Sequence, residues 1–488
     1  MHRLRPFTLP FLVTLLSWSV AGAATTPGSL DATFGAQGVA LSSVGDQGAV
    51  AMVLQADGKI LTATIGDAAT DRASLRITRF TNGGVVDSTF GSAGVATVSV
   101  AVDTLSVVHA MLRQNSDSRI VVAGRSIGAF ALLRLTSAGA IDAGFGSGGT
   151  ASTKVSGDDE VFALAQQTDG KLIAVGSADD GLDSDFAIVR YTSAGVPDPT
   201  FSGDGIATVE FGGSDTARAV AVQGDGSIVV AGSTEGSNSD IAVARLTPTG
   251  APDPIFGVAG KATTAVTARE DAAYAVIVQT DGKIVVAGEA DDDFVLLRYG
   301  DNGQPDAGFG SGGIARTNVS AGARDGARAL VRQSDDKLVA GGLASPTRAG
   351  DFALVRYTTT GQPDSSFGSG GIVTTSVAAT FDEEMTALLL QIDGKLLAAG
   401  LSEDGNTSYQ MVARYLTTTA ALCGDADQNG SIQAGDALRV LRNAVGVSVT
   451  CPLFVCDVDN SGGVQAGDAL KVLKKAVGQQ LTLVCPLP

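Results

Sequence analysis

Most of the chain alternates short runs of apolar residues with clusters of Gly, Asp, Ser and Thr. The runs are rich in Val, Ile and Phe and too short for helices, so the pattern predicts short β-strands joined by tight turns. In one clear stretch the runs AVIV and IVVAG flank Asp281-Gly282. An Asp-Gly pair between two such runs predicts a hairpin with a type I′ turn, which has positive φ at both central residues.

A phrase of the form D-x-x-F-G divides this region into seven units. Its phenylalanines lie 53 to 58 residues apart and are Phe34, Phe90, Phe145, Phe201, Phe256, Phe309 and Phe367. Each unit also holds the hairpin phrase and a run similar to D-F-A-L-V-R-Y, which gives four short strands. Seven units of four strands predict a mainly β fold, a seven-bladed β-propeller over residues 24–415. How the two ends of the ring meet stays open.

Two further residue types recur at fixed places in all seven units. The last strand of each unit carries one arginine: Arg79, Arg134, Arg190, Arg245, Arg298, Arg356 and Arg414. These arginines are either a ring of anion sites or structural partners of the repeated aspartates, and sevenfold copying favours the structural role. An alanine lies four residues before the repeated glutamine in each unit, for example Ala219 and Ala275. We expect these alanines to allow tight packing of the blades near the axis.

The three phrases, in fixed order and copied seven times, resemble the bacterial delta-60 repeat over about residues 30–415. This resemblance implies tandem repeats in a large exported protein. No activity is generally assigned to that family, so the resemblance supports the architecture more than the function.

Composition and charge narrow the classes of function. The chain contains 63 glycines and only 5% aromatic residues, which suits many turns better than long helices. Its formal net charge of −18 would repel a phosphate backbone, which disfavours nucleic-acid binding. Residues 1–23 predict a secretory signal peptide: a basic start, an apolar run, and Ala21-Gly22-Ala23 before the cleavage site. We expect a secreted or cell-surface protein without a membrane span in the mature chain.

After a linker at 416–422, residues 423–488 contain a duplicated acidic segment. Its halves are GDADQNGSIQAGDALRVLRNAVG and CDVDNSGGVQAGDALKVLKKAVG, 32 residues apart. Calcium needs six to eight oxygen ligands gathered by a sharply turning loop, and both halves supply them in order. The first predicted site consists of Asp425, Asp427, Asn429, Ser431 and Asp436. The second consists of Asp457, Asp459, Ser461, Gly463 and Asp468. Two Ca²⁺ ions are therefore expected.

A helix is expected after each loop, at 436–445 and 468–477. Leu438 and Leu441 fall on one face of the first helix, and Leu470 and Leu473 on one face of the second. This loop-and-helix duplication, without an entering helix, resembles a type I dockerin. The resemblance implies calcium-dependent folding and, in many members, docking to a cohesin. The loops carry Ala434-Gly435 and Ala466-Gly467 where cohesin-binding members often carry polar residues.

Four cysteines, Cys423, Cys451, Cys456 and Cys485, all lie in this last module. In an exported protein an even number predicts two disulfides, with three pairings open; a zinc site is the alternative. The symmetry of the duplication favours Cys423–Cys451 and Cys456–Cys485.

These observations favour an exported, non-catalytic binding or structural protein. Its propeller would bind a polysaccharide or a protein, and the calcium module would attach it to a cohesin-like or cell-surface partner. After the signal peptide the only histidine is His109, at a position where other units carry Phe162, Arg218 or Tyr274. Ser-His and Cys-His nucleophilic schemes therefore have little support. The alternative is a carbohydrate-active hydrolase or lyase with carboxylates in the propeller funnel.

Overall fold

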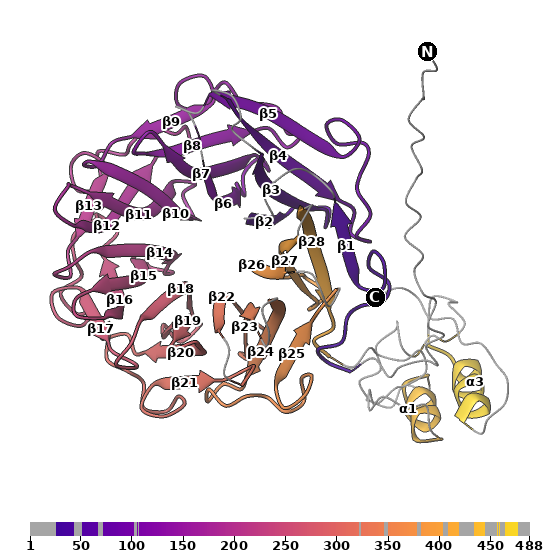
Figure 1. Cartoon of the computed structure of the whole chain (residues 1–488). Helices are drawn as coiled ribbons and strands as arrows, with labels where there is room; N and C mark the ends of the chain where they lie inside the picture. Colours follow the sequence, from indigo (N-terminus) through magenta and orange to yellow (C-terminus); the bar gives the residue numbers. More distant parts are fainter. Residues whose placement is uncertain are drawn as a thin grey trace, which may run out of the picture. The chain divides into compact units, whose positions relative to one another are not determined.

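The computed structural model describes residues 26–42, 51–66, 72–101, 105, 107–321, 324–345, 350–377, 382–403, 408–418, 434–444, 456, 458 and 464–476. The chain divides into two compact units, of which one is Thr26–Thr418. In this unit the described residues form seven four-stranded antiparallel sheets arranged as blades around a central axis (Figure 1). The expected mainly β, seven-bladed propeller is confirmed.

The first three blades run, from the axis outward, through the following strands. Blade 1 consists of β2 (Ala51–Leu54), β3 (Ile60–Gly66), β4 (Arg72–Phe80) and β5 (Val95–Ala101). Blade 2 consists of β6 (Val107–Arg113), β7 (Ile120–Ser126), β8 (Ala129–Leu135) and β9 (Thr150–Thr153). Blade 3 consists of β10 (Asp158–Gln166), β11 (Leu172–Asp179), β12 (Ser184–Tyr191) and β13 (Ile206–Val209).

The other four blades repeat this order. Blade 4 consists of β14 (Asp215–Val222), β15 (Ile228–Glu235), β16 (Ser239–Leu246) and β17 (Lys261–Thr264). Blade 5 consists of β18 (Asp271–Val278), β19 (Ile284–Ala290), β20 (Asp293–Tyr299) and β21 (Ile314–Thr317). Blade 6 consists of β22 (Asp325–Arg332), β23 (Leu338–Ala344), β24 (Asp351–Tyr357) and β25 (Ile372–Thr375). Blade 7 consists of β26 (Asp382–Leu390), β27 (Leu396–Glu403), β28 (Ser408–Tyr415) and β1 (Val39–Ser42).

Blade 7 closes the ring with strands from both ends of the propeller sequence. Its outer strand β1 pairs with β28, with Val39 opposite Ala413 and Ser42 opposite Gln410. The sequence unit is therefore offset from the blade by one strand, because the strand after each Phe-Gly phrase completes the preceding blade. This offset joins the two termini of the ring by a ladder of backbone hydrogen bonds and leaves no open end.

The hairpin turns between the first two strands differ from the expected type I′ turn. In the pair Asp281-Gly282 only the glycine has positive φ, at 84°. Gly282 N–H donates to the carbonyl of Gln279 at 3.0 Å, and Gln279 N–H donates to Lys283 at 2.8 Å. The loop is therefore longer than two residues, so only its last position requires the left-handed region. The degenerate copies place Ser118 and Asp336 there, with φ of 58° and 62°.

The two ends of the ring carry different connections. The hairpin turns and the D-x-x-F-G segments lie at one end, called the turn face. At the other end, called the funnel face, the first strand of each blade begins and the second strand leads to the third. In blade 3, for example, Asp158 lies opposite Asp179, and Asp179 opposite Ser184. The connections of variable length and charge, such as Asp179–Ser184 and Ala290–Asp293, therefore belong to the funnel face.

The second unit contains two described helices, α1 (Ala434–Ala444) and α3 (Ala466–Ala476), which contact each other. Val440 and Val472 are fully buried. The leucines of both helices are exposed instead, at 50% and 39% for Leu438 and Leu441. Two short helices alone do not support a dockerin-like module, which stays a proposal. No described helix is long and apolar enough to cross a membrane.

Candidate functional site

The predicted calcium ligands lie mostly outside the described residues. These are Asp425, Asp427, Asn429, Ser431, Asp457, Asp459, Ser461 and Gly463, and for Asp436 only the helical backbone is described. Asp468 is described and buried, and its two carboxylate oxygens accept the N–H groups of Val458 at 3.0 Å and Gln465 at 2.7 Å. Val458 and Gln465 both belong to the second predicted calcium loop, so Asp468 contacts described residues of that loop. Within the described part of the chain no three His, Cys, Asp or Glu side chains are grouped to hold a metal.

One cysteine of the four lies among the described residues. Cys456 is fully buried, and no described cysteine is a free thiol. The other three lie outside the described residues, so the pairing Cys456–Cys485 and its symmetry mate stay predictions.

The repeated arginines are structural on the turn face. In every blade the arginine Nε or Nη2 lies 2.7–2.9 Å from the aspartate of the D-x-x-F-G phrase. Its guanidinium carbon lies 4.6–5.0 Å from the centre of the phenylalanine ring of the same phrase. In blade 3, Arg190 also donates to the carbonyl of Pro248 in blade 4 at 2.5 Å. Each arginine is thus paired with an aspartate and stabilises its blade, which favours the structural role over an anion site.

The innermost strands share a second feature that the sequence analysis did not identify. A β-bulge interrupts the first strand of blades 2 to 7, immediately before the repeated alanine. A bulge adds one residue and re-aims its side chain. The bulge residues in chain order are His109, Phe162, Arg218, Tyr274, Arg328 and Thr386. They form a single position in the blade, and its chemistry differs from blade to blade.

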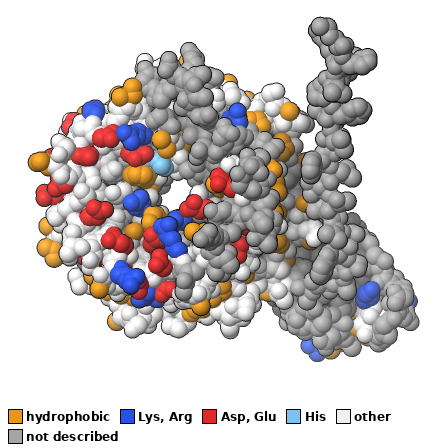
Figure 2. Space-filling view, viewed as in Figure 1, with side chains coloured by type: hydrophobic (Ala, Val, Ile, Leu, Met, Phe, Trp, Pro, Cys, Tyr) orange, Lys and Arg blue, Asp and Glu red, His pale blue; other side chains and the backbone are white. Residues whose placement is uncertain are grey.

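Five of these bulge residues, His109, Phe162, Arg218, Tyr274 and Arg328, form a continuous stack that we call the arc. The rings of His109 and Phe162 lie 4.8 Å apart. The guanidinium of Arg218 lies 5.6 Å from the centre of Phe162 and 5.3 Å from that of Tyr274, and Arg328 lies 4.1 Å from Tyr274. Because each residue comes from the innermost strand of a different blade, the arc follows the rim of the central opening. Figure 2 shows acidic and basic side chains gathered around this opening.

Three glutamates accompany the arc. Glu160 Oε1 lies 2.8 Å from His109 Nε2, and Glu289 Oε2 accepts a bond from Arg328 at 2.9 Å. Glu289 also accepts a bond from the Tyr274 hydroxyl at 3.1 Å, and Glu384 lies 4.0 Å from Arg328 Nε. The bond from His109 holds the pKa of Glu160 below its usual value. Burial would raise the pKa of Glu289, but the charges of Arg328 and Arg324 outweigh it and lower this pKa.

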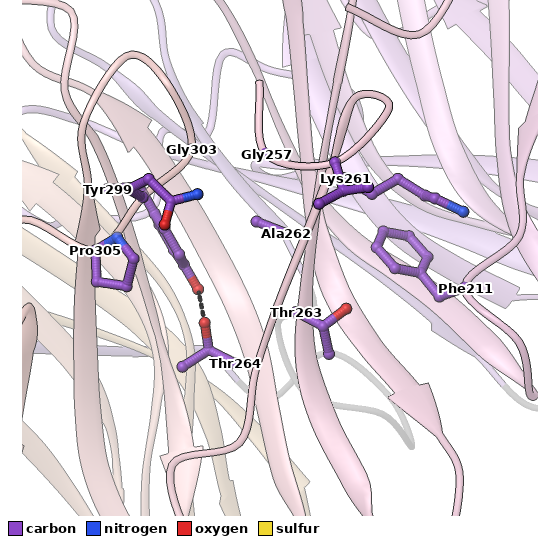
Figure 3. A pocket seen from close by; sticks show the side chains of 11 residues that line it. Phe211, Gly257, Lys261, Ala262, Thr263, Thr264, Tyr299, Gly303 and Pro305 are labelled. Carbon is purple, nitrogen blue, oxygen red and sulfur yellow. Dashed lines mark hydrogen bonds between the residues drawn. The ribbon is translucent and has the colours of Figure 1, made fainter. Parts of the chain in front are cut away.

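A separate pocket of about 390 Å³ lies at the outer edge between blades 4 and 5 (Figure 3). Phe211 and Lys261 line one side, and Tyr299 and Pro305 line the other. Three of its polar side chains are already engaged: Lys261 Nζ donates to the carbonyl of Glu210 at 2.7 Å, and the Tyr299 and Thr264 hydroxyls share a bond of 2.8 Å. The arc and its three glutamates contain more ionisable groups than this pocket, and these groups can form further hydrogen bonds. The arc is therefore the stronger candidate site.

The sequence carries a signal for the position of the arc. His109 occupies the position that Phe162, Arg218 and Tyr274 occupy in other units, and the residue type at this position is not repeated. Yet it immediately precedes the strictly repeated alanine. A position next to an invariant residue lies at the same place in every blade. A residue that varies at such a position can give each blade a different part in recognition.

Comparisons with known proteins agree with this architecture. Five segments match the family described as "Domain of unknown function (DUF5122) beta-propeller": residues 115–145, 167–201, 223–256, 279–309 and 333–367. No curated protein matches the sequence significantly.

Solved structures similar to this chain include three with low sequence identity. A streptogramin B lyase is 13% identical, with a TM-score of 0.44, and covers 77% of this chain and 97% of its own. Sqt1 from Chaetomium thermophilum is 12% identical, with a TM-score of 0.46, and covers 80% and 100%. The polysaccharide lyase Uly1 is 10% identical, with a TM-score of 0.44, and covers 81% and 97%. Similarity at this level carries no inference about activity. The family match and the seven blades together show that this chain is a β-propeller repeat protein.

Proposed function

We propose that the protein is an exported, non-catalytic binding protein whose propeller holds a ligand at its funnel face. The observation that supports this proposal is the arc. Residues that serve only folding, such as the arginine and the alanine of each unit, are copied with the blade. The bulge residue next to that alanine changes from histidine to aromatic to arginine around the ring. Chemical variation confined to one end of a rigid scaffold is typical of a recognition surface.

The arc is accessible enough to bind a ligand. The side chains of His109 and Glu160 are 27% and 24% exposed, and that of Glu384 is 50% exposed. Aromatic rings, guanidinium groups and carboxylates together offer donors, acceptors and apolar edges, which suits a polar polymer such as a polysaccharide. A protein partner at this face is the second ligand class.

The test is binding of the mature protein to a panel of soluble polysaccharides and to surface proteins of the producing cell. Saturable binding that weakens in an arc variant such as Phe162→Ala supports the proposal. Binding to every member of the panel unchanged by Phe162→Ala would contradict it.

The alternative function is a carbohydrate-active hydrolase or lyase. The observation in its favour is the bond between His109 and Glu160, two proton-transferring groups at the funnel. Against a hydrolase that uses the glutamates of the arc, a general acid needs a carboxyl pKa raised toward neutrality, whereas the pKa values of Glu160 and Glu289 are lowered. Release of reducing or unsaturated sugar ends, abolished by Glu160→Gln, would favour the enzyme over the binding protein.

The same proposal gives the last 66 residues a role in calcium binding and attachment. Asp468 supports it, because its buried carboxylate accepts the N–H groups of Val458 and Gln465, which both belong to the second predicted loop. We propose two Ca²⁺ sites, formed by the ten ligands predicted from the sequence, in a dockerin-like module. Calorimetric titration of the mature chain with Ca²⁺ tests this, with two sites expected.

The exposed leucines of the two described helices support a role in attachment. Leu438 and Leu441 on α1 and their equivalents Leu470 and Leu473 on α3 are 39–54% exposed. Exposed leucines repeated on both helices suit an apolar partner surface, such as a cohesin-like or cell-surface protein. Export through the signal peptide at 1–23 and disulfides within the module complete the proposal. Mass spectrometry of the secreted chain under non-reducing conditions tests the cleavage site and the cysteine pairing.

A further inference from the structure

Arg218 is the central member of the arc. No described carboxylate lies within ion-pair distance of its guanidinium, although its charge helps to lower the pKa of Glu160. His109 bonds Glu160, and Arg328 and Arg324 both pair with Glu289. No described residue forms an ion pair or a hydrogen bond with the guanidinium of Arg218, and its Nε is buried without an acceptor. The Nε atoms of Arg79, Arg190 and Arg356 also lack a hydrogen bond, but each of them lies 2.9 Å from an aspartate oxygen. Arg218 has no such carboxylate, and leaving a charged donor without an acceptor is costly.

The way in which Arg218 is held leaves its donors free for a ligand. The rings of Phe162 and Tyr274 lie near the guanidinium, at 5.6 and 5.3 Å. Contacts of this kind occupy the faces of the group, whereas its N–H donors point outward in the plane. A planar fork of donors fixed in this way matches a carboxylate.

Acceptors lie near this donor. The charge of Arg218 helps to lower the pKa of Glu160, and Glu289 accepts a bond from the hydroxyl of Tyr274, whose ring contacts Arg218. Each carboxylate keeps lone pairs that are not used by its cation. These groups would accept bonds from hydroxyl groups of a ligand that places one carboxylate between several hydroxyls. Uronic-acid sugars have this composition.

We propose, on the basis of the function proposed above, that the arc binds a uronate-containing polysaccharide, with one uronate carboxylate held by Arg218. A neutral glycan would leave the Arg218 charge unmatched. A densely sulfated chain would meet Glu160, Glu289 and Glu384 as repelling neighbours, in a protein whose net charge is already −18. A polysaccharide with one carboxylate per sugar supplies an anion for Arg218 and is repelled less by the glutamates than a densely sulfated chain.

The test measures binding of short uronate oligosaccharides (galacturonate, mannuronate and glucuronate series) to the mature full-length protein by calorimetry at constant calcium. The matched probes are the methyl esters of the same oligosaccharides, which keep every hydroxyl and remove the charge. We expect at least one free acid to bind about ten- to hundredfold more tightly than its ester, the usual effect of a charge-assisted hydrogen bond. Raising the salt concentration should weaken this binding.

Arg218→Gln should remove the preference for the acid, and Arg218→Lys should restore it in part, because a lysine keeps the charge but not the planar fork. Arg332→Gln is the matched control: Arg332 pairs with Asp336 at the turn-face end of β22, so the variant should bind like the parent.

The outcomes separate this inference from the function on which it rests. Equal binding of acids and esters, or an acid preference that survives Arg218→Gln, overturns the uronate assignment and leaves a binding propeller intact. An acidic peptide that binds more tightly than every uronate and depends on Arg218 also overturns the sugar. If no glycan or protein of the wider panel binds in a manner sensitive to Phe162→Ala, the proposed function fails as well.

Discussion

Arg414 Nε donates to Asp31 Oδ2 at 2.9 Å, although the two residues are 383 positions apart in the chain. The same arginine donates to the carbonyl of Asn82 in blade 1 at 2.6 Å. One buried side chain therefore fastens the first segment of the propeller to its last strand and fastens blade 7 to blade 1. In the other blades the equivalent arginine and aspartate belong to one local stretch, eight residues apart in the case of Arg190 and Asp198.

Arg414→Gln should destabilise the propeller more than an exposed arginine substitution does. Removing Arg414 leaves the carboxylate of Asp31 with Lys395 Nζ at 3.2 Å as its remaining cation. The cost in the free energy of unfolding should therefore lie at the lower end of about 3–5 kcal/mol. The measurement is urea-induced unfolding followed by circular dichroism. Arg332→Gln, which breaks a half-exposed pair, should change this free energy by less than about 1 kcal/mol. Equal effects of the two variants would show that the junction between blade 7 and blade 1 does not depend on Arg414.

Acid should unfold the propeller through its repeated aspartates. Burial would raise the pKa of Asp31, but bonds from Thr33 and the charge of Arg414 outweigh it and lower the pKa from 3.8 to about 2. Asp198 and Asp364 also have pKa values of about 2. Because these folded-state values lie below the unfolded ones, their stabilisation is complete above about pH 5. It is lost as the pH falls from about 4 to about 2.

Thr33→Val sharpens this prediction. The Thr33 hydroxyl bonds Asp31 at 2.7 Å, so its loss raises the pKa of Asp31 and should move the acid transition to higher pH. The control is Thr360→Val, whose hydroxyl bonds only another exposed threonine. Circular dichroism along a pH titration measures both. A transition unmoved by Thr33→Val would argue against this role of the aspartate.

The bulges depend on a glycine within the second strand of the blade, directly after a run of apolar residues. A Cβ added at Gly232 would lie 1.8 Å from the carbonyl oxygen of Thr216, next to the bulge at Arg218. Gly232→Ala should therefore cost about 1–3 kcal/mol of stability, because the strands must move apart. Gly224→Ala, at a position with nothing within 4 Å, should be close to neutral. Thermal unfolding compares them, and a neutral Gly232→Ala would mean that the bulge is not fixed by this contact.

Sequence reasoning reached the blades but not their junction or the site. The phrases around Phe34 and Arg414 predicted seven units, since a propeller copies whatever packs between blades. The closure was left open because strand pairing between distant segments, such as Val39 with Ala413, has no local signature. The arc was missed because a bulge is a shift in pairing register between two strands, and neither strand shows it alone. In the sequence, the sign of this position is a residue of variable type, such as Arg218, directly before the invariant alanine.

Asp468→Asn tests the proposed calcium module at the one predicted ligand whose side chain is described. Asparagine keeps the shape of the side chain but loses its charge, which a calcium loop needs at its closing position. Calorimetric titration should show one site in the variant where the parent has two. Asp335→Asn, at an exposed pair on the propeller, should keep both sites. Two unchanged sites in Asp468→Asn would place the ion elsewhere.

The location of ligand recognition is tested most directly by comparing variants of the arc with a variant of the pocket at the outer edge. Each is measured with the ligand that binds best in the panel. Phe162→Ala and Arg218→Gln change the arc, and Lys261→Gln changes the pocket at the outer edge. The account predicts that both arc variants weaken binding about tenfold or more, while Lys261→Gln binds as the parent does. Binding lost in Lys261→Gln and kept in the two arc variants would contradict it.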